Sequence, residues 1–154
     1  MSGRTFLDTN VFVYLFDRDD PAKQQRAREI VNQVGAAAVL STQVLQEFYV
    51  SVTRKLATPL AAAEAERAVH DLASLDVVVI DVPMVKHAVA LSRGDALSFW
   101  DALIVEAARA HGCNRLLSED LQDGRAFGDV QIENPFRTSP DPDESDPKSG
   151  RKRP

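Results

Sequence analysis

Residues 5–16 read TFLDTNVFVYLF, a sequence whose pattern changes in the middle. Residues 5–7 form a short apolar run typical of a buried strand, and residues 11–16 have the spacing of a short helix. Further strand-like runs occur at residues 37–40, 77–80, 116–117 and 130–132. Segments with helical spacing lie between them, at residues 21–34, 43–56, 60–74, 84–93 and 99–111. Strands that alternate with helices predict an α/β fold, a three-layer sandwich in which helices flank a small central parallel sheet.

The chain is predicted to be one folded domain followed by a tail. It has 154 residues, of which 44% are hydrophobic and 27% charged, as is usual for a soluble globular protein. Residues 137–154 contain no aliphatic or aromatic side chain and hold four of the eight prolines. Such a segment has no apolar surface to bury against the entropy cost of ordering its backbone. We therefore expect a folded unit at residues 1–136 and a disordered, charged tail at residues 137–154.

The composition excludes several classes of protein. A single cysteine, Cys113, rules out an intrachain disulfide and a multi-cysteine zinc site, and we expect it to pack as a small apolar residue. No apolar run approaches the roughly 20 residues of a transmembrane helix or forms a signal-peptide core, so we expect a cytoplasmic protein with no membrane partner. The net charge of −5 argues against a generally basic, nucleic-acid-binding surface. Any nucleic-acid role would therefore rest on a local basic patch or on bound cations.

Two carboxylates follow strands of the predicted sheet. Asp8 comes directly after the strand at residues 5–7, and Asp120 follows the strand at residues 116–117. Ligands of α/β folds collect beyond the carboxyl ends of the strands, which is where both side chains belong. Each also has an ordinary explanation, since Asp8 can cap the next helix and Asp120 precedes the common turn pair Asp123-Gly124.

Two more carboxylates lie on predicted helices. Asp101 follows Ser98 at the spacing of a capping box, yet its helix is apolar nearly all round, and a carboxylate beside Ile104 is costly to bury without a cation or donors. Glu47 shares a helix face with Val44, at a position where a solvated residue is the usual occupant.

Taken together, these four carboxylates predict a metal site. An all-oxygen set suits Mg²⁺ or Mn²⁺ rather than zinc. Because like charges repel, the cluster would destabilise the fold unless a cation occupied it. The three histidines are not spaced as a ligand pair.

Four motifs and a closing tripeptide resemble the PIN domain family, and within it the VapC-type ribonuclease toxins of toxin–antitoxin pairs. They read FLDTN at residues 6–10, VLQEF at 44–48, SFWDALI at 98–104, LLSEDLQDG at 116–124 and NPF at 134–136. The resemblance spans the whole predicted folded unit and stops where the tail begins.

The resemblance implies the role of each site residue. The catalytic, metal-binding set would be Asp8, Glu47, Asp101 and Asp120, with Asp8 and Asp101 as the principal ligands. Asn10 would support the first carboxylate, and Ser118 stands where the family has a serine or threonine. Asp123 is an alternative to Asp120 for the last acidic position.

The resemblance also implies an activity and partners. The chain would be a Mg²⁺-dependent endoribonuclease, with Mn²⁺ as a substitute, that leaves a 5′-phosphate and a 3′-hydroxyl. It would be the toxin of a type II toxin–antitoxin pair, with RNA as substrate, a cognate antitoxin as partner and a second copy of itself in a homodimer. The basic residues nearest the site in sequence are Arg93, Arg115 and Arg125, and the run at residues 151–153 is a further candidate for RNA contact.

Two alternatives belong to other classes. A non-enzymatic PIN-like binding module would use the cleft only for docking, but all four carboxylates are present, which favours activity. A phosphoryl-transferring enzyme with Asp8 as nucleophile is less well supported, because the haloacid-dehalogenase type has an aspartate where this chain has Asn10.

Overall fold

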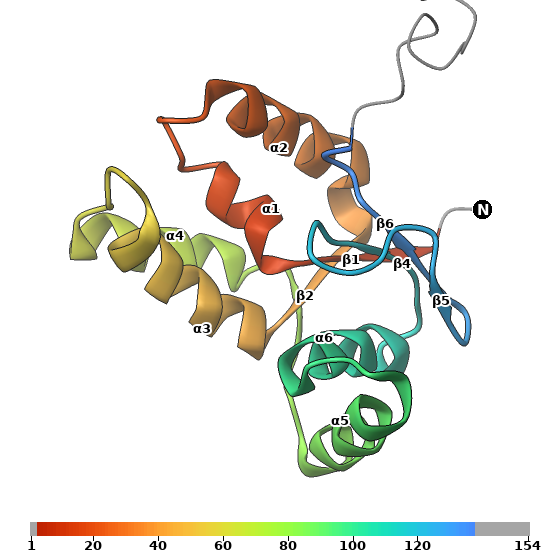
Figure 1. Ribbon diagram of the computed structural model, residues 1–154. Coiled ribbons are helices and arrows are strands. Elements are labelled where there is room, and N and C mark those ends of the chain that lie inside the picture. The colour runs from red at the N-terminus through yellow and green to blue at the C-terminus, as the bar shows by residue number, and fades with distance from the viewer. Residues whose placement is uncertain (1–2, 138–154) are drawn as a thin grey trace, which may run out of the picture.

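The computed structural model describes residues 3–137, which form a single sheet covered by helices (Figure 1). The strand order is β3-β2-β1-β4-β6-β5. All neighbouring strands are parallel except β5 and β6. The strands are β1 (Arg4–Leu7), β2 (Ala38–Ser41), β3 (Asp76–Val78), β4 (Cys113–Leu117), β5 (Ala126–Phe127) and β6 (Val130–Glu133).

The predicted α/β sandwich is confirmed, with one strand added. The five predicted strands are present and parallel, whereas the two-residue strand β5 was not predicted. β5 pairs antiparallel with β6 through the turn at Gly128, whose φ of +60° favours glycine. A two-residue strand is too short to produce a hydrophobic period, so the sequence gives no signal for it.

The helices cover both faces of the sheet. Figure 1 shows α1 and α2 on one side and α5 and α6 on the other, with α3 packed against α1 and α4 against α3. Their bounds are α1 (Thr9–Tyr14), α2 (Pro21–Val34), α3 (Thr42–Val50), α4 (Ala62–Leu72), α5 (Val82–Asp95) and α6 (Phe99–Ala110). A 3₁₀ turn, η1 (Gly35–Ala37), precedes β2, and α3 continues into a π-helical turn, η2 (Ser51–Lys55).

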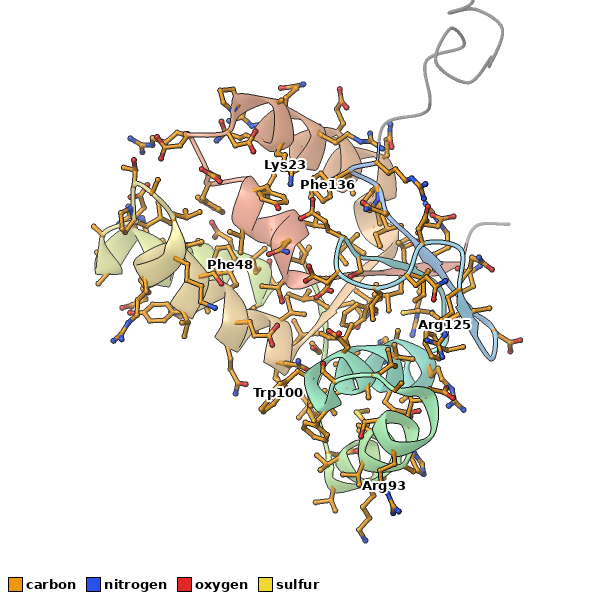
Figure 2. All side chains as sticks on the ribbon, viewed as in Figure 1. Lys23, Phe48, Arg93, Trp100, Arg125 and Phe136 are labelled. Carbon is orange, nitrogen blue, oxygen red and sulfur yellow. The ribbon has the colours of Figure 1, made fainter. Side chains whose placement is uncertain are left out.

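The core lies between the central strands and the helices that follow them. Phe6 of β1, Phe12 of α1 and Phe48 of α3 are fully buried, and Figure 2 shows Phe48 in the interior. Cys113 is buried as predicted, and burial raises the pKa of its thiol to about 11. A buried, protonated thiol of this kind packs as a small apolar side chain.

The closing NPF motif fixes the end of the described chain to the first two helices. Phe136 packs edge-on against Tyr14 with ring centroids 4.9 Å apart, and the Lys23 ammonium lies 4.6 Å from the Tyr14 ring centroid. Arg26 donates to the Pro135 carbonyl at 2.8 Å. The folded unit predicted at residues 1–136 therefore ends in packed structure. The tail predicted at residues 137–154 lies outside the described residues, apart from Arg137.

None of the helices in residues 3–137 is both long enough and apolar enough to cross a membrane.

Candidate active site

One cleft of about 470 Å³ receives all four predicted carboxylates. Asp8 follows β1 and Asp120 follows β4, and these strands are neighbours in the sheet. Glu47 comes from α3 and Asp101 from the first turn of α6. Four segments far apart in sequence therefore converge on one acidic cleft at the carboxyl ends of the strands.

Asp8 is the most buried of the four, at 7% exposure. It caps α1, accepting the Thr9 backbone N–H at 2.7 Å, and it also accepts the Ser118 hydroxyl at 2.7 Å. Burial raises the pKa of Asp8 to about 6, the two hydrogen bonds oppose that rise, and the charges of Asp120 and Glu47 add to it. The same side chain thus caps a helix and lines the cleft.

Ser118 organises the start of the loop after β4. Its hydroxyl donates to Asp8 and accepts the backbone N–H groups of Asp120 and Leu121 at 3.2 and 3.3 Å. This geometry suits the supporting role that the family resemblance implied. Asn10, predicted to support Asp8, has its amide nitrogen 3.5 Å from Asp120 Oδ2. As the second residue of α1, Asn10 faces the loop after β4.

Glu47 is held at both of its oxygens. Thr9 Oγ1 donates to Oε1 at 2.7 Å, and Gln43 Nε2 donates to Oε2 at 3.1 Å. The same Gln43 nitrogen lies 3.2 Å from the Trp100 carbonyl oxygen, so one amide connects α3 to the start of α6. The side-chain amide oxygen of Gln43, Oε1, is buried and has no hydrogen-bond partner within the described chain.

The two candidates for the last acidic position lie in different surroundings. Asp120 lines the cleft, and its pKa is raised by burial and by the charges of Asp101, Glu119 and Glu47. Asp123 instead accepts the Asn134 backbone N–H at 2.9 Å and the Arg137 guanidinium at 3.0 Å, which lower its pKa.

The donor chemistry of the cleft fits a hard divalent cation. Its acidic groups offer only oxygen ligands. The pKa of the buried Asp8 is raised by the negative charges of Asp120 and Glu47, and no cationic side chain in the described part of the chain opposes them. As the side chains stand, no three acidic, His or Cys side chains within residues 3–137 are grouped closely enough to hold one ion. Since like charges repel, carboxylates without a cation are expected to stay apart.

Comparison with known proteins agrees with this geometry. The pattern that defines the PIN domain matches residues 5–126. The chain belongs to the PIN domain family. Among curated proteins, no sequence matches it.

Three solved structures share the fold of this PIN domain. A chain of a toxin–antitoxin complex from Klebsiella pneumoniae is 19% identical with a TM-score of 0.67, over 87% of this chain and 99% of that one. Mycobacterium tuberculosis VapC20, a sarcin–ricin loop cleaving toxin, is 20% identical with a TM-score of 0.61, over 75% and 89%. DNA-bound VapBC from Salmonella typhimurium is 20% identical with a TM-score of 0.62, over 85% and 97%. At these identities the similarity establishes the fold alone.

Two of the three basic residues expected near the site form ion pairs elsewhere in the PIN domain. Arg115 pairs with Glu133 at 2.7 Å, and Arg125 pairs with Asp95 at 3.6 Å. Arg93 lies on α5 (Figure 2). The basic run at residues 151–153 is outside the described residues.

Several residues that line the cleft were not predicted as site residues, among them Gln43, Lys55 and Trp100. Gln43 and Lys55 lie four residues before and eight residues after Glu47, so helical spacing alone would have placed them on its face. Lys55 is the basic residue of the cleft lining. Trp100 directly precedes Asp101, and no periodicity argument distinguishes an exposed tryptophan there from a core residue.

Proposed function

We propose that this PIN domain is a Mg²⁺-dependent endoribonuclease and the toxin of a type II toxin–antitoxin pair. The observation that carries the proposal is the convergence of Asp8, Glu47, Asp101 and Asp120 on one cleft. Asp8 in particular is buried at a cost that a bound cation would offset. A structural cap needs no such burial among further carboxylates.

The residues divide the work as follows. Asp8 and Asp101 would hold the cation, which when bound polarises the scissile phosphate and lowers the pKa of a water. Ser118 and the Thr9 N–H fix the Asp8 carboxylate, and Thr9 and Gln43 fix that of Glu47. Asn10 approaches Oδ2 of Asp120, which leaves Oδ1 to accept the proton of the attacking water. The water oxygen would bond to phosphorus while the bond to the 3′ oxygen breaks, and the leaving oxygen would take a proton from solvent water to become the 3′-hydroxyl.

The partners are proposed from the structural neighbours. One neighbour is part of a toxin–antitoxin complex, one cleaves the sarcin–ricin loop of RNA, and one is a VapBC assembly on DNA. We extend these properties to this chain as a structured RNA substrate and a cognate antitoxin. The family resemblance adds two further proposals, a homodimer and a cytoplasmic location.

The experiment that tests the activity uses antitoxin-free protein and a panel of structured RNAs, with Mg²⁺, with Mn²⁺ and with EDTA. Wild type should give discrete cuts that need the metal, and Asp8→Asn and Asp101→Asn should abolish them. Asp120→Asn should lose most activity, whereas the matched variant Asp123→Asn should retain it, because Asp123 is bound to Asn134 and Arg137.

Other outcomes would support the alternatives. Folded protein that binds metal but cuts none of the RNAs would favour the binding module. A covalent phosphate on Asp8 would favour the phosphoryl-transferring enzyme.

A further inference from the structure

We propose that Trp100 forms a base-stacking subsite of the acidic cleft, where the indole ring receives an unpaired nucleobase beside the cleaved phosphate. This inference rests on the proposed ribonuclease function, and it adds how the substrate is held. It assigns a single-stranded stretch of RNA as the ligand.

The position of Trp100 is the first observation. Trp100 is 61% exposed, although burying an indole ring is strongly favourable. It lines the same cleft as the four carboxylates and is the residue next to Asp101. An exposed aromatic face beside a phosphate-processing site is the arrangement that single-stranded nucleic acids recognise by stacking.

Trp100 is also anchored from two sides. Its ring packs edge-on against Phe99 with centroids 5.1 Å apart and an interplanar angle of 74°. Its carbonyl oxygen lies 3.2 Å from the Gln43 amide nitrogen that also holds Glu47. Figure 2 shows Trp100 at the start of α6, close to the beginning of α3. The backbone of Trp100 is thereby held beside a carboxylate of the site, and Phe99 packs against its ring.

The residues along α3 and η2 that line the cleft define the direction in which a ligand strand would lie. Gln43, Glu47, Ser51 and Lys55 recur every four residues along α3 and η2, and all four line the cleft. At about 1.5 Å of helix rise per residue, Gln43 and Lys55 are separated by roughly 15–18 Å along this face. Because Trp100 contacts Gln43, it lies near one end of this row and Lys55 lies at the other, with Glu47 between them.

These three features match the repeating chemistry of a nucleic-acid strand. Lys55 has no ion-pair partner within the described chain and is placed to contact a backbone phosphate. The carboxylates receive the scissile phosphate through the cation, and Trp100 stacks on a base. Gln43 is only 4% exposed, and its side-chain oxygen Oε1 accepts no hydrogen bond from the described protein. A hydrogen-bond acceptor at this end of the cleft is therefore left for a ligand.

The first test reads Trp100 directly, because it is the only tryptophan of the chain. Single-stranded RNA of about eight nucleotides is titrated into Asp120→Asn protein in Mg²⁺, which keeps the proposed cation ligands Asp8 and Asp101 but should cut slowly. Tryptophan emission and RNA anisotropy are followed together. We expect quenching on binding. The same RNA in a duplex should quench less, because its bases are already stacked on one another.

The second test measures cleavage by variants of the otherwise wild-type chain. Trp100→Ala should raise KM, used as a measure of RNA affinity, by roughly 5- to 150-fold, the range that loss of one stacked base gives. Trp100→Phe should retain most of the affinity. The matched control is Tyr49→Ala, since Tyr49 is an exposed aromatic residue of α3 on a different surface hollow. Thermal unfolding shows whether each variant is folded.

The outcomes separate this inference from the proposed function. Normal cleavage with no emission change, and a wild-type KM in Trp100→Ala, would overturn the subsite and leave the ribonuclease intact. Failure of the wild-type chain to bind or cut any RNA would overturn both. RNA could leave the Trp100 emission unchanged while binding of the cognate antitoxin shifts it to the blue. That result would assign Trp100 to a protein interface and overturn the subsite.

Discussion

Asp8 serves the fold and the site with the same two oxygens. As the cap of α1 it accepts the Thr9 N–H, and as a buried group of the acidic cleft it accepts the Ser118 hydroxyl. Burial raises its pKa from 3.8 to about 6. A neutral amide at this position could accept the Thr9 N–H without carrying a charge, so the buried carboxylate has a cost in stability that a bound cation would offset.

The first prediction is that the loss of unfolding free energy caused by the buried Asp8 charge depends on pH in EDTA. The native state holds the Asp8 proton more tightly than the unfolded chain, so wild-type stability falls as pH rises from about 4 to about 6. Asp8→Asn removes this loss. It should match wild type near pH 4 and exceed it by about 3 kcal/mol at pH 7.5, from a shift of about two pKa units. Urea unfolding at both pH values measures it, and an Asn variant that is less stable at pH 7.5 would contradict it.

The second prediction concerns how Glu47 is held. Thr9→Val keeps the branched shape of a buried side chain but removes the hydroxyl that donates to Glu47. A hydrogen bond to a charged group contributes about 1.5–3 kcal/mol, so we expect kcat on RNA to fall about tenfold or more. Thr53→Val is the matched control, because the Thr53 hydroxyl contacts only the backbone carbonyls of Tyr49 and Val50. Equal kcat values in the two variants would show that Thr9 does not position Glu47.

At the scale of helices and strands, the sequence predicted which segments form them better than it predicted where each one ends. Hydrophobic period located every helix, because each buries one face on the sheet or on a neighbour. The predicted helix at residues 43–56 was continuous, whereas the chain forms α3 followed by the π-helical turn η2. The π-helical turn occurs where the Leu60 N–H bonds to the Val52 carbonyl at 2.8 Å. Leu60 lies in the segment that follows the turn, so no local sequence pattern encodes this contact.

The third prediction belongs to the end of α5. Ala96 ends this helix in the left-handed conformation, with φ +55° and ψ +36°. A Cβ atom is strained there, and glycine is the usual occupant of such a position. Ala96→Gly should stabilise the protein by about 0.5–1 kcal/mol after the entropy cost of glycine is subtracted. The measurement is urea unfolding.

The control for Ala96→Gly is the same change inside the helix. Ala90→Gly, at an exposed interior position of α5, should destabilise the protein by about 1 kcal/mol. If both substitutions destabilise it equally, the strain argument at Ala96 is wrong.

At the scale of the whole molecule, predicting the four carboxylates was easier than predicting what surrounds them. Asp8 and Asp120 could be placed from strand order, because parallel strands bring their carboxyl ends to one edge. Gln43, Lys55 and Trp100 depend on how α3 packs relative to the start of α6, which is a contact between distant segments. The contact of Asn10 with Asp120 was not predicted for a similar reason, since the loop after β4 is positioned by Ser118.

The fourth prediction joins the site to the stability of the whole fold. A cation that binds only the native state adds RT ln(1 + [L]/Kd), about 1.4 kcal/mol for each tenfold excess over Kd. Mg²⁺ should therefore raise the unfolding temperature of wild type, and Asp8→Asn and Asp101→Asn should lose most of that gain. Glu66→Gln, which changes an exposed carboxylate on α4, should keep it. Differential scanning calorimetry in EDTA and in increasing Mg²⁺ measures the effect.

The decisive feature of that experiment is a reversal of order. In EDTA at pH 7.5, Asp8→Asn should be more stable than wild type, because it removes a buried charge. In saturating Mg²⁺ wild type should become the more stable of the two, because its charge then has a partner that the amide cannot hold as well. A purely structural Asp8 would give curves that never cross, whatever the metal concentration. Parallel curves would therefore refute the metal site even if both proteins were well folded.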